Sequence, residues 1–432
     1  MYSLRLIQNK NQPSRLLKIF NISIVAYIYL AISLFNSKSF ADSIANDKLS
    51  LSSQEILKIN TERNNLIEKL GNDYNASFLP DTHFISLKSV KYDIDFNVDK
   101  NHYIENISLQ PHPFYVDIYG GNFFITDKLG RIFIISENLL NGLENKKIDV
   151  KNFIVTTNLR KNINVLDSYI FDNDLFISYS YGSESCKKIG ISKASLSLKK
   201  LSFTQIFSPK ECSKVVMGGR MASVRNNSSV GLLITTSSED NNSPDNRAQD
   251  KNSIFGKTIF LDTKTNDFSI YSLGHRNAQG IYVDGDLIIQ TEHGPRGGDE
   301  INLIVQGGNY GWPVASYGEK YGAKELHTTY EKSHAETRFR EPVYVFVPSI
   351  AIGEIIKVPN QFSEFWNESF LIASLNKKTL YRAKFSNDYS RILYIEPIYI
   401  GSRIRDMKFS GNGERLYLAL EMPNQIMVLS NY

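Results

Sequence analysis

The chain has 432 residues, of which 42% are apolar and 22% charged, the composition of a globular protein and not of a disordered one. Its 49 basic and 45 acidic residues nearly balance, and no basic face with interleaved aromatic residues stands out, so nucleic acid is excluded as an expected partner. Aromatic residues reach 12%, which favours strands over a helical bundle.

The N-terminal segment has the organisation of an export signal. Basic residues precede an apolar stretch at 19–35, and the small residues Ser39 and Ala41 follow it. This order predicts a signal peptide at 1–41 and an exported protein, periplasmic in a bacterium. The alternative is an uncleaved N-terminal membrane tether, because the apolar stretch is near the short end for a membrane span.

The next segment, 42–79, is predicted to be a helical extension. The sequence SSQE at 52–55 forms a capping box, apolar residues follow at helical spacing, and Gly71 is a natural end. We expect a short helix there that carries no chemistry.

The two cysteines of the chain are Cys186 and Cys212. In an oxidising compartment they could form a disulfide, and the alternative is two separate buried thiols. Two cysteines are too few for a thiolate metal cluster.

From about residue 80 the sequence becomes a succession of short β-rich runs separated by Gly, Asn and Asp turns. The clearest runs are 115–119, 123–126, 132–135, 175–179, 230–235, 258–261, 280–283, 287–290, 343–347, 369–373, 380–383 and 416–420. They fall into about six sets without intervening amphipathic helices, which favours an all-β, six-bladed β-propeller over 80–432. The polar stretch 237–252 is expected to be a long surface loop.

Glycines, forked donors and carboxylates concentrate in one part of the chain. The sequence reads GHRNAQG at 274–280, EHGPRGGDEIN at 292–302 and GNYGWP at 308–313. Glycines let backbone carbonyls approach a ligand or a hard cation closely, and arginine offers a planar fork to carboxylates. Any one of these residues could equally belong to a turn held by a structural ion pair, so the joint pattern carries the prediction of a binding site.

This pattern resembles the soluble quinoprotein glucose dehydrogenases and aldose sugar dehydrogenases, the glucose/sorbosone dehydrogenase family. The resemblance covers roughly residues 110 to 430 and is strongest at 274–313. Its other motifs are GGR at 218–220, AQD at 248–250, GK at 256–257, EPVY at 341–344, Trp366, RIRD at 403–406 and GNG at 411–413.

The resemblance implies a six-bladed propeller that binds pyrroloquinoline quinone (PQQ), a tricarboxylated cofactor, at one mouth. By its motifs, Arg276 and Asn277 would contact the quinone and the reacting sugar, with Arg276 as the catalytic residue. Arg403 and Arg405 would bind the cofactor carboxylates. Arginine would stabilise the charge that develops as hydride arrives.

The resemblance also implies calcium. The backbone carbonyls of Gly294 and Pro295 would ligate a calcium ion in the active site, and Glu300 and Tyr310 would contribute to a second, structural one. A calcium ion next to the quinone would act as a Lewis acid.

Two positions depart from the family pattern. The family's general base is a histidine four residues before the arginine that is Arg220 here, and this chain has Val216, which cannot accept a proton. The family's cofactor-binding lysine corresponds to Asn376, although Lys377, one residue further on, could substitute for it.

No other histidine is a compelling base. His275 and His293 belong to the family pattern, His112 could face the mouth, and His334 lies in polar sequence and is expected at the surface.

Three functions therefore remain open at this point. The first is a quinoprotein dehydrogenase that oxidises a small sugar or related alcohol and passes electrons to an external acceptor. The second is a propeller that binds a sugar or anionic ligand without turnover, which Val216 and Asn376 favour. The third is a calcium-dependent lactonase or esterase, but its ring of inward carboxylates cannot be identified in the sequence. The oligomeric state is not indicated.

Overall fold

The computed structural model describes residues 87–96, 112–141, 143, 146–225, 230–238, 246–320, 330 and 334–431. All of them belong to the second of two compact units, His83–Tyr432. The first unit, Met1–Thr82, lies outside the described residues, and with it the predicted signal peptide and helical extension. No described helix has the length and apolar character needed to cross a membrane.

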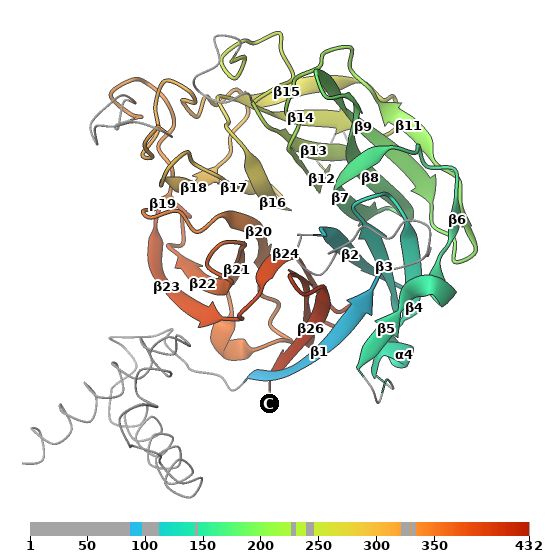
Figure 1. Cartoon of the computed structure of the whole chain (residues 1–432). Coiled ribbons are helices and arrows are strands. Elements are labelled where there is room, and N and C mark those ends of the chain that lie inside the picture. The colour runs from blue at the N-terminus through green and yellow to red at the C-terminus, as the bar shows by residue number, and fades with distance from the viewer. Residues whose placement is uncertain are drawn as a thin grey trace, which may run out of the picture. The chain divides into compact units, whose positions relative to one another are not determined.

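Over the described residues, six sheets of three to five strands surround a central axis, so the predicted all-β, six-bladed propeller is confirmed (Figure 1). From the innermost strand outward, the first blade is β2 (Phe114–Tyr119), β3 (Asn122–Asp127) and β4 (Ile132–Ser136), and the second is β7 (Ile163–Phe171), β8 (Asp174–Ser183), β9 (Cys186–Ser195) and β11 (Thr204–Phe207). The third blade is β12 (Gly218–Arg225), β13 (Val230–Thr236), β14 (Lys257–Asp262) and β15 (Phe268–Leu273), and the fourth is β16 (Ala278–Asp284), β17 (Leu287–Glu292), β18 (Asp299–Leu303) and β19 (Tyr344–Phe346). The fifth blade is β20 (Ile352–Lys357), β21 (Ser369–Ser374), β22 (Thr379–Phe385) and β23 (Ile392–Tyr399), and the sixth is β24 (Arg403–Phe409), β25 (Arg415–Glu421), β26 (Gln425–Asn431) and β1 (Leu87–Asp95).

A few short elements complete the described part of the chain. They are β5 (Lys147–Asp149), which adds a parallel strand to β1, the pair β6 (Thr156–Thr157) and β10 (Lys200–Leu201), the helix α4 (Glu137–Asn141), and the 3-10 turns η3 (Val150–Phe153) and η4 (Glu364–Trp366).

The ring is closed by the two ends of the propeller sequence. Strand β1 pairs antiparallel with β26, so the sixth blade takes three strands from the C-terminal end and its fourth from the N-terminal side (Figure 1). Such a closure leaves no seam in the ring, since the blade at the junction is built from both ends of the domain. The two segments it joins are more than 300 positions apart, with Tyr92 opposite Ile426.

The hydrophobic core lies between neighbouring blades. One cluster, for example, joins Phe123 of the first blade to Tyr417 of the sixth, whose rings meet edge to face at 4.6 Å. Middle strands are covered on both faces, and β21 and β25 are accordingly buried over almost their whole lengths. Outer strands such as β23 are partly exposed. This is why middle strands appear in the sequence as unbroken apolar runs.

The expected β-rich runs coincide with strands, including 123–126 within β3 and 416–420 within β25. The expectation that 237–252 is wholly a surface loop is wrong, because Ser237, Ser238 and Ala248 are buried. The structure also decides between the alternatives for the cysteines, because Cys186 and Cys212 form a disulfide.

Candidate active site

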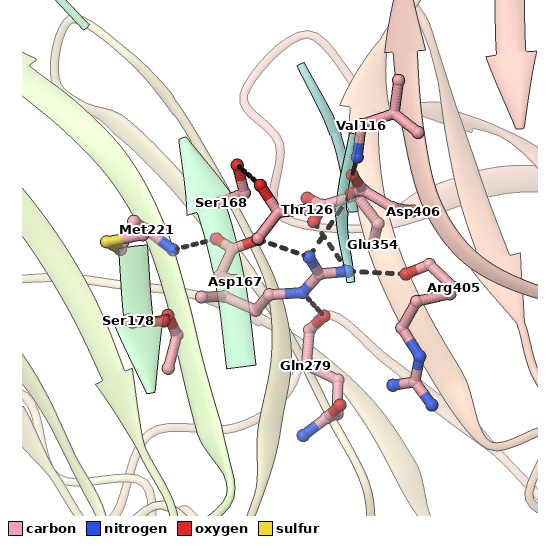
Figure 2. A network of polar contacts seen from close by, with 12 residues as sticks. Val116, Thr126, Asp167, Ser168, Ser178, Met221, Gln279, Glu354, Arg405 and Asp406 are labelled. Atoms are coloured by element: carbon pink, nitrogen blue, oxygen red, sulfur yellow. Dashed lines mark hydrogen bonds and ion pairs between the residues drawn. The ribbon is translucent and has the colours of Figure 1, made fainter. Parts of the chain in front are cut away.

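The buried guanidinium of Arg220 joins the innermost strands at the centre of the propeller. Figure 2 shows the polar network to which it belongs. Its partners are Asp167 Oδ1 (2.7 Å), Asp406 Oδ1 (3.4 Å), Glu354 Oε2 (3.2 Å) and the backbone oxygens of Arg405 (2.7 Å) and Gln279 (2.9 Å). The network is completed by the first blade, because the Val116 N–H donates to Asp406 at 2.9 Å. All six innermost strands therefore meet here at one level, in the early to middle part of each.

The channel contains more acid than base. Asp117 lies beside the network, and Lys408 Nζ is 3.9 Å from its Oδ1. Burial raises the pKa of Asp117 to about 7, against the opposing charge of Lys408. Burial likewise raises the pKa of Glu354 to about 7, against the charge of Arg220. Near neutral pH Asp117 and Glu354 therefore hold a proton more readily than exposed carboxyls do.

The predicted catalytic arginine lies just before β16, at the end of the channel where the inner strands begin. Arg276 Nη1 donates to the carbonyls of His293 (3.1 Å) and Gly294 (2.9 Å), and the guanidinium lies 5.3 Å from the centre of the Trp312 ring. Its Nε is buried and finds no hydrogen-bond partner among the described residues. A buried donor of this kind is costly unless a ligand accepts from it.

Asn277 is held in place by two neighbours. Its side-chain oxygen accepts from Gln279 Nε2 at 2.8 Å, and its amide nitrogen is 3.4 Å from His293 Nδ1. Burial lowers the pKa of His293, and the charges of Arg276 and Arg405 add to this effect. Arg276 lies just before β16 and Arg405 near the start of β24, so both lie at the end of the channel where the inner strands begin.

The late arginine pair shares one carboxylate. Arg403 Nε donates to Glu421 Oε2 at 2.9 Å and Arg405 Nε donates to Glu421 Oε1 at 2.6 Å, from adjacent strands β24 and β25. The register of β24 against β25 shifts between Ile404 and Asp406, and both side chains nevertheless reach the same carboxylate. Each guanidinium has further N–H donors beyond the one used on Glu421. The pair therefore presents an anion-binding surface.

The turn that carries Gly294 allows no side chain at this residue. A Cβ on Gly294 would lie 2.1 Å from the carbonyl oxygen of Gly298. Asp299 fastens the turn, since its Oδ1 accepts from the Gly294 N–H at 3.0 Å and its Oδ2 from the N–H of Ile350 and of Ile352. The Gly294 carbonyl already accepts from Arg276, so a cation bound there would share this oxygen with a positively charged guanidinium.

The residues predicted for a structural calcium lie nearby but have other partners. The Tyr310 hydroxyl donates to the Leu303 carbonyl at 2.6 Å and accepts from the Val305 N–H at 3.0 Å. Glu300 is buried and accepts from Asn302 Nδ2 at 3.2 Å, and burial together with the charge of Glu292 raises its pKa well above the ordinary value. No cluster of three or more His, Cys, Asp or Glu side chains suited to a metal occurs among the described residues.

The histidines of this region are structural in different ways. His275 is enclosed by Ser272, Glu292 and Gln290 and stacks on Tyr310 at 4.7 Å, as its place in the pattern suggested. The expectation that His334 is a surface residue is wrong. It is buried and stacks on Tyr317, because the chain around it folds back on the turn of the fourth blade.

The two altered family positions lie in different surroundings. Val216 is 7% exposed and packs in the apolar cluster between the second and third blades, with Phe176 and Met221. Asn376 and Lys377 are exposed in the turn after β21, and their backbone N–H groups both donate to the Ile350 carbonyl. These positions therefore supply neither a base nor a fixed cation at the arginine cluster, which is the group of Arg276, Arg403 and Arg405.

Other motif residues hold the loops that frame the site. The Lys257 ammonium donates to the carbonyls of Arg247, Ala248 and Phe255 at 2.6 to 3.0 Å. The side-chain amides of Gln249 and Asn309 are hydrogen-bonded to each other. These motifs fasten the 246–257 loop to the 308–313 turn.

Sequence reasoning missed the channel acids. Asp117 and Asp167 are the single charged residues of β2 and β7, and Glu354 interrupts the apolar residues of β20, which was the available signal. They are the inward carboxylates that the lactonase hypothesis required. However, Arg220 and Lys408 lie among them, so they do not form an open cation site.

Residues 110–428 match the family Glucose / Sorbosone dehydrogenase. The chain belongs to this family. The predicted family is therefore confirmed over most of the chain, including every innermost strand.

The amino-acid sequence of this chain is similar to those of several proteins from other organisms. It is 28% identical to the aldose sugar dehydrogenase YliI of Escherichia coli, over 59% of this chain and 72% of that protein. It is 26% identical to the quinoprotein glucose dehydrogenase B of Acinetobacter calcoaceticus, over 36% of this chain and 44% of that protein. An uncharacterised Synechocystis protein, slr1608, is 30% identical over 38% and 39%. The chain thus spans less than half the length of two of these relatives.

Solved structures share the fold of this family member. A crystal structure of a glucose dehydrogenase superposes with a TM-score of 0.61 at 23% identity, over 75% of this chain and 98% of that one. The apo form of the soluble aldose sugar dehydrogenase from Escherichia coli superposes with a TM-score of 0.60 at 22% identity, over 80% of this chain and 100% of that one. The PQQ-bound aldose sugar dehydrogenase from Streptomyces coelicolor gives 0.53 at 18%, over 81% and 100%.

Proposed function

We propose that this family member is a quinoprotein that binds PQQ at the Arg276 mouth and oxidises a small sugar or related alcohol there, with an external electron acceptor. The observation that carries the proposal is that Arg276 and the Arg403–Arg405 pair lie at the same end of the channel, just before β16 and at the start of β24. The names of the Acinetobacter relative and of the Streptomyces structure support the choice of cofactor, and the name of the Escherichia coli relative supports the choice of substrate class.

The residues present fit an anionic cofactor. The buried Nε of Arg276 has no partner within the described part of the chain and needs an acceptor. Arg403 and Arg405 can each give a carboxylate further N–H groups. When bound, PQQ would supply the two-electron acceptor that a sugar dehydrogenase needs. Arg276 would orient the ligand by hydrogen bonds, and Asn277, fixed by Gln279 and His293, would offer an amide to the substrate hydroxyl.

The residues predicted to bind calcium already have hydrogen-bond partners within the protein. The Gly294 carbonyl is bonded to Arg276, and the Tyr310 hydroxyl is bonded on both sides to backbone groups. As arranged, these groups do not form a cation site, so we assign no chemical step to calcium. The predicted calcium roles of Gly294, Pro295, Glu300 and Tyr310 stay predictions.

Export to an oxidising compartment, with the signal at 1–41, is part of the same proposal. The Cys186–Cys212 disulfide supports it, since disulfides persist in such compartments and are rare in reducing ones. Mass measurement of the exported protein, with cleavage expected after Ala41, tests this part.

The first experiment is a titration of the purified protein with PQQ, with and without calcium, followed by absorbance and melting temperature. Saturable binding should weaken about tenfold or more when Arg405 is changed to alanine, because a charge-assisted bond is lost. Arg391→Ala, in an exposed turn of the fifth blade, should bind as the unaltered protein does. Absence of binding, or equal loss in both variants, would refute the proposal.

A second function, ligand binding without turnover, is favoured by Val216. A valine enclosed in an apolar cluster cannot accept the substrate proton. Sugar-dependent reduction of an artificial dye by PQQ-loaded protein separates the two functions. Turnover supports the dehydrogenase, and binding of the quinone without any turnover supports the second.

A further inference from the structure

A pocket of about 430 Å³ opens at the end of the channel opposite the arginine cluster. It is lined by the last residues of β2 and β7 and by Lys408 and Phe409 at the end of β24. Arg276 and Arg403 lie before or at the beginning of their inner strands, whereas these residues lie at the ends of theirs. Along these inner strands, the residues of the buried Arg220 network lie between the two places.

Each acid that lines this pocket has a basic partner, Lys408 within the lining for Asp117 and Arg225 beside the pocket for Asp172. Asp117 has Lys408 at 3.9 Å, and Asp172 has Arg225 at 3.1 Å. The Lys408 ammonium also lies 5.5 Å from the centre of the Tyr169 ring. A cationic ligand would compete with Lys408 for the same acid and ring, and an anionic ligand would meet Asp117. The lining therefore fits a molecule without net charge.

The same pocket combines aromatic rings with hydrogen-bonding groups. Tyr119 is 44% exposed, and Phe171 and Phe409 are partly buried in the wall. Lys408 supplies N–H donors and Asp117 a carboxyl group within the same space. Its volume lies in the range of small-molecule sites, which are typically apolar walls with a few placed polar groups. Rings beside a donor and an acceptor suit a compound with C–H faces and several hydroxyls.

We infer that this pocket is a second binding site, for a small neutral polyhydroxylated molecule such as a monosaccharide or polyol, independent of the Arg276 mouth. The inference does not depend on the quinone, because none of the residues that line the pocket belongs to the arginine cluster. Binding is expected in protein that holds no cofactor.

The experiment is isothermal titration calorimetry of quinone-free protein with glucose and glycerol, and with glucosamine and gluconate as charged comparators. Glucose or glycerol should bind saturably, and Tyr119→Ala should weaken binding about fivefold or more, as truncation of an aromatic anchor does. Asp117→Asn, which keeps the size of the side chain, should weaken it as well. Tyr399→Ala, a 71% exposed tyrosine on the outer strand of the fifth blade, is the matched control and should leave binding unchanged.

Arg276→Ala separates the two mouths. Binding that survives in this variant and weakens in Tyr119→Ala supports the inference, even if the protein fails to bind PQQ. Binding lost in Arg276→Ala and kept in Tyr119→Ala assigns the sugar to the other mouth and overturns it. Absence of saturable binding by any neutral probe, or tighter binding of glucosamine or gluconate than of glucose, overturns it too. Melting curves of each variant exclude unfolding as the cause.

Discussion

At the scale of single residues, the site is defined by which groups already have partners. Arg276 uses Nη1 on two carbonyls and keeps a buried Nε without a partner among the described residues. Tyr310, by contrast, has both hydrogen-bonding capacities of its hydroxyl satisfied by backbone groups. The same family motif thus contains a residue available to a ligand and one that is structural, and only the contacts distinguish them.

Val216 gives the sharpest test at this scale. Changing Val216 to histidine would place a polar imidazole in the apolar cluster with Phe176, so the free energy of unfolding should fall by about 1–3 kcal/mol in urea titrations. Val215→His, at a neighbouring position that is 46% exposed, should change it by no more than about 0.5 kcal/mol. An equally stable Val216→His variant that gains sugar-dependent dye reduction would show that the side chain faces the site.

At the scale of elements, the six innermost strands are joined by charge as well as by apolar packing. Arg220 of β12 binds acids from β7, β20 and β24 and carbonyls of β16 and β24. A buried pair of this kind gains little over an apolar core, but loss of one partner leaves the others unpaired in a poor solvent for charge. The network therefore specifies how the strands meet more than it adds stability.

Arg220→Met tests this role. It leaves Asp167, Glu354 and Asp406 without their shared guanidinium, so the free energy of unfolding should fall by about 3–5 kcal/mol. Arg225→Met on the same strand breaks only an exposed pair with Asp172, worth about 0–1 kcal/mol. Equal losses in the two variants, measured by urea unfolding, would contradict the network's importance.

At the scale of the whole molecule, closing the ring collects acids from several blades in one channel and raises their pKa values. For Asp117, the folded value of about 7 lies above the ordinary 3.8. Below both values the carboxyl is protonated in either state, and its burial costs least. As the pH rises from about 4 to 7 the unfolded chain loses the proton first, so this group's contribution to stability falls, by up to roughly 4 kcal/mol.

The predicted quantity is the difference in free energy of unfolding between a variant and the unaltered protein. In this difference the titration of all other groups cancels. Asp117→Asn carries no charge at any pH, so its free energy of unfolding relative to the unaltered protein should increase between about pH 4.5 and about pH 8. Asp172→Asn, at an exposed position, should run parallel to the unaltered protein. Unfolding in urea across this pH range gives the measurement, and parallel curves for Asp117→Asn would contradict the raised pKa.

The sequence by itself determined the family, the all-β class and the middle strands. Middle strands are packed on both faces, so β3 and β25 appear as apolar runs that need no tertiary information. The motif at 274–313 can likewise be recognised without a structure, because its residues are close together in the sequence. Outer strands such as β23, which are partly exposed, and inner strands interrupted by acids, such as β7 and β20, gave no such signal.

Only the tertiary structure decided the closure by β1, the Arg220 network and the pocket at the opposite mouth. Each depends on residues from several blades, and in the sequence Asp117, Arg220 and Lys408 lie about a hundred or more positions apart. Their charges become neighbours only when six blades close around one axis. Burial then changes what these side chains do: the same carboxyl that would be an ordinary solvated acid in an open strand becomes a shared ligand of Arg220 or a partner of Lys408.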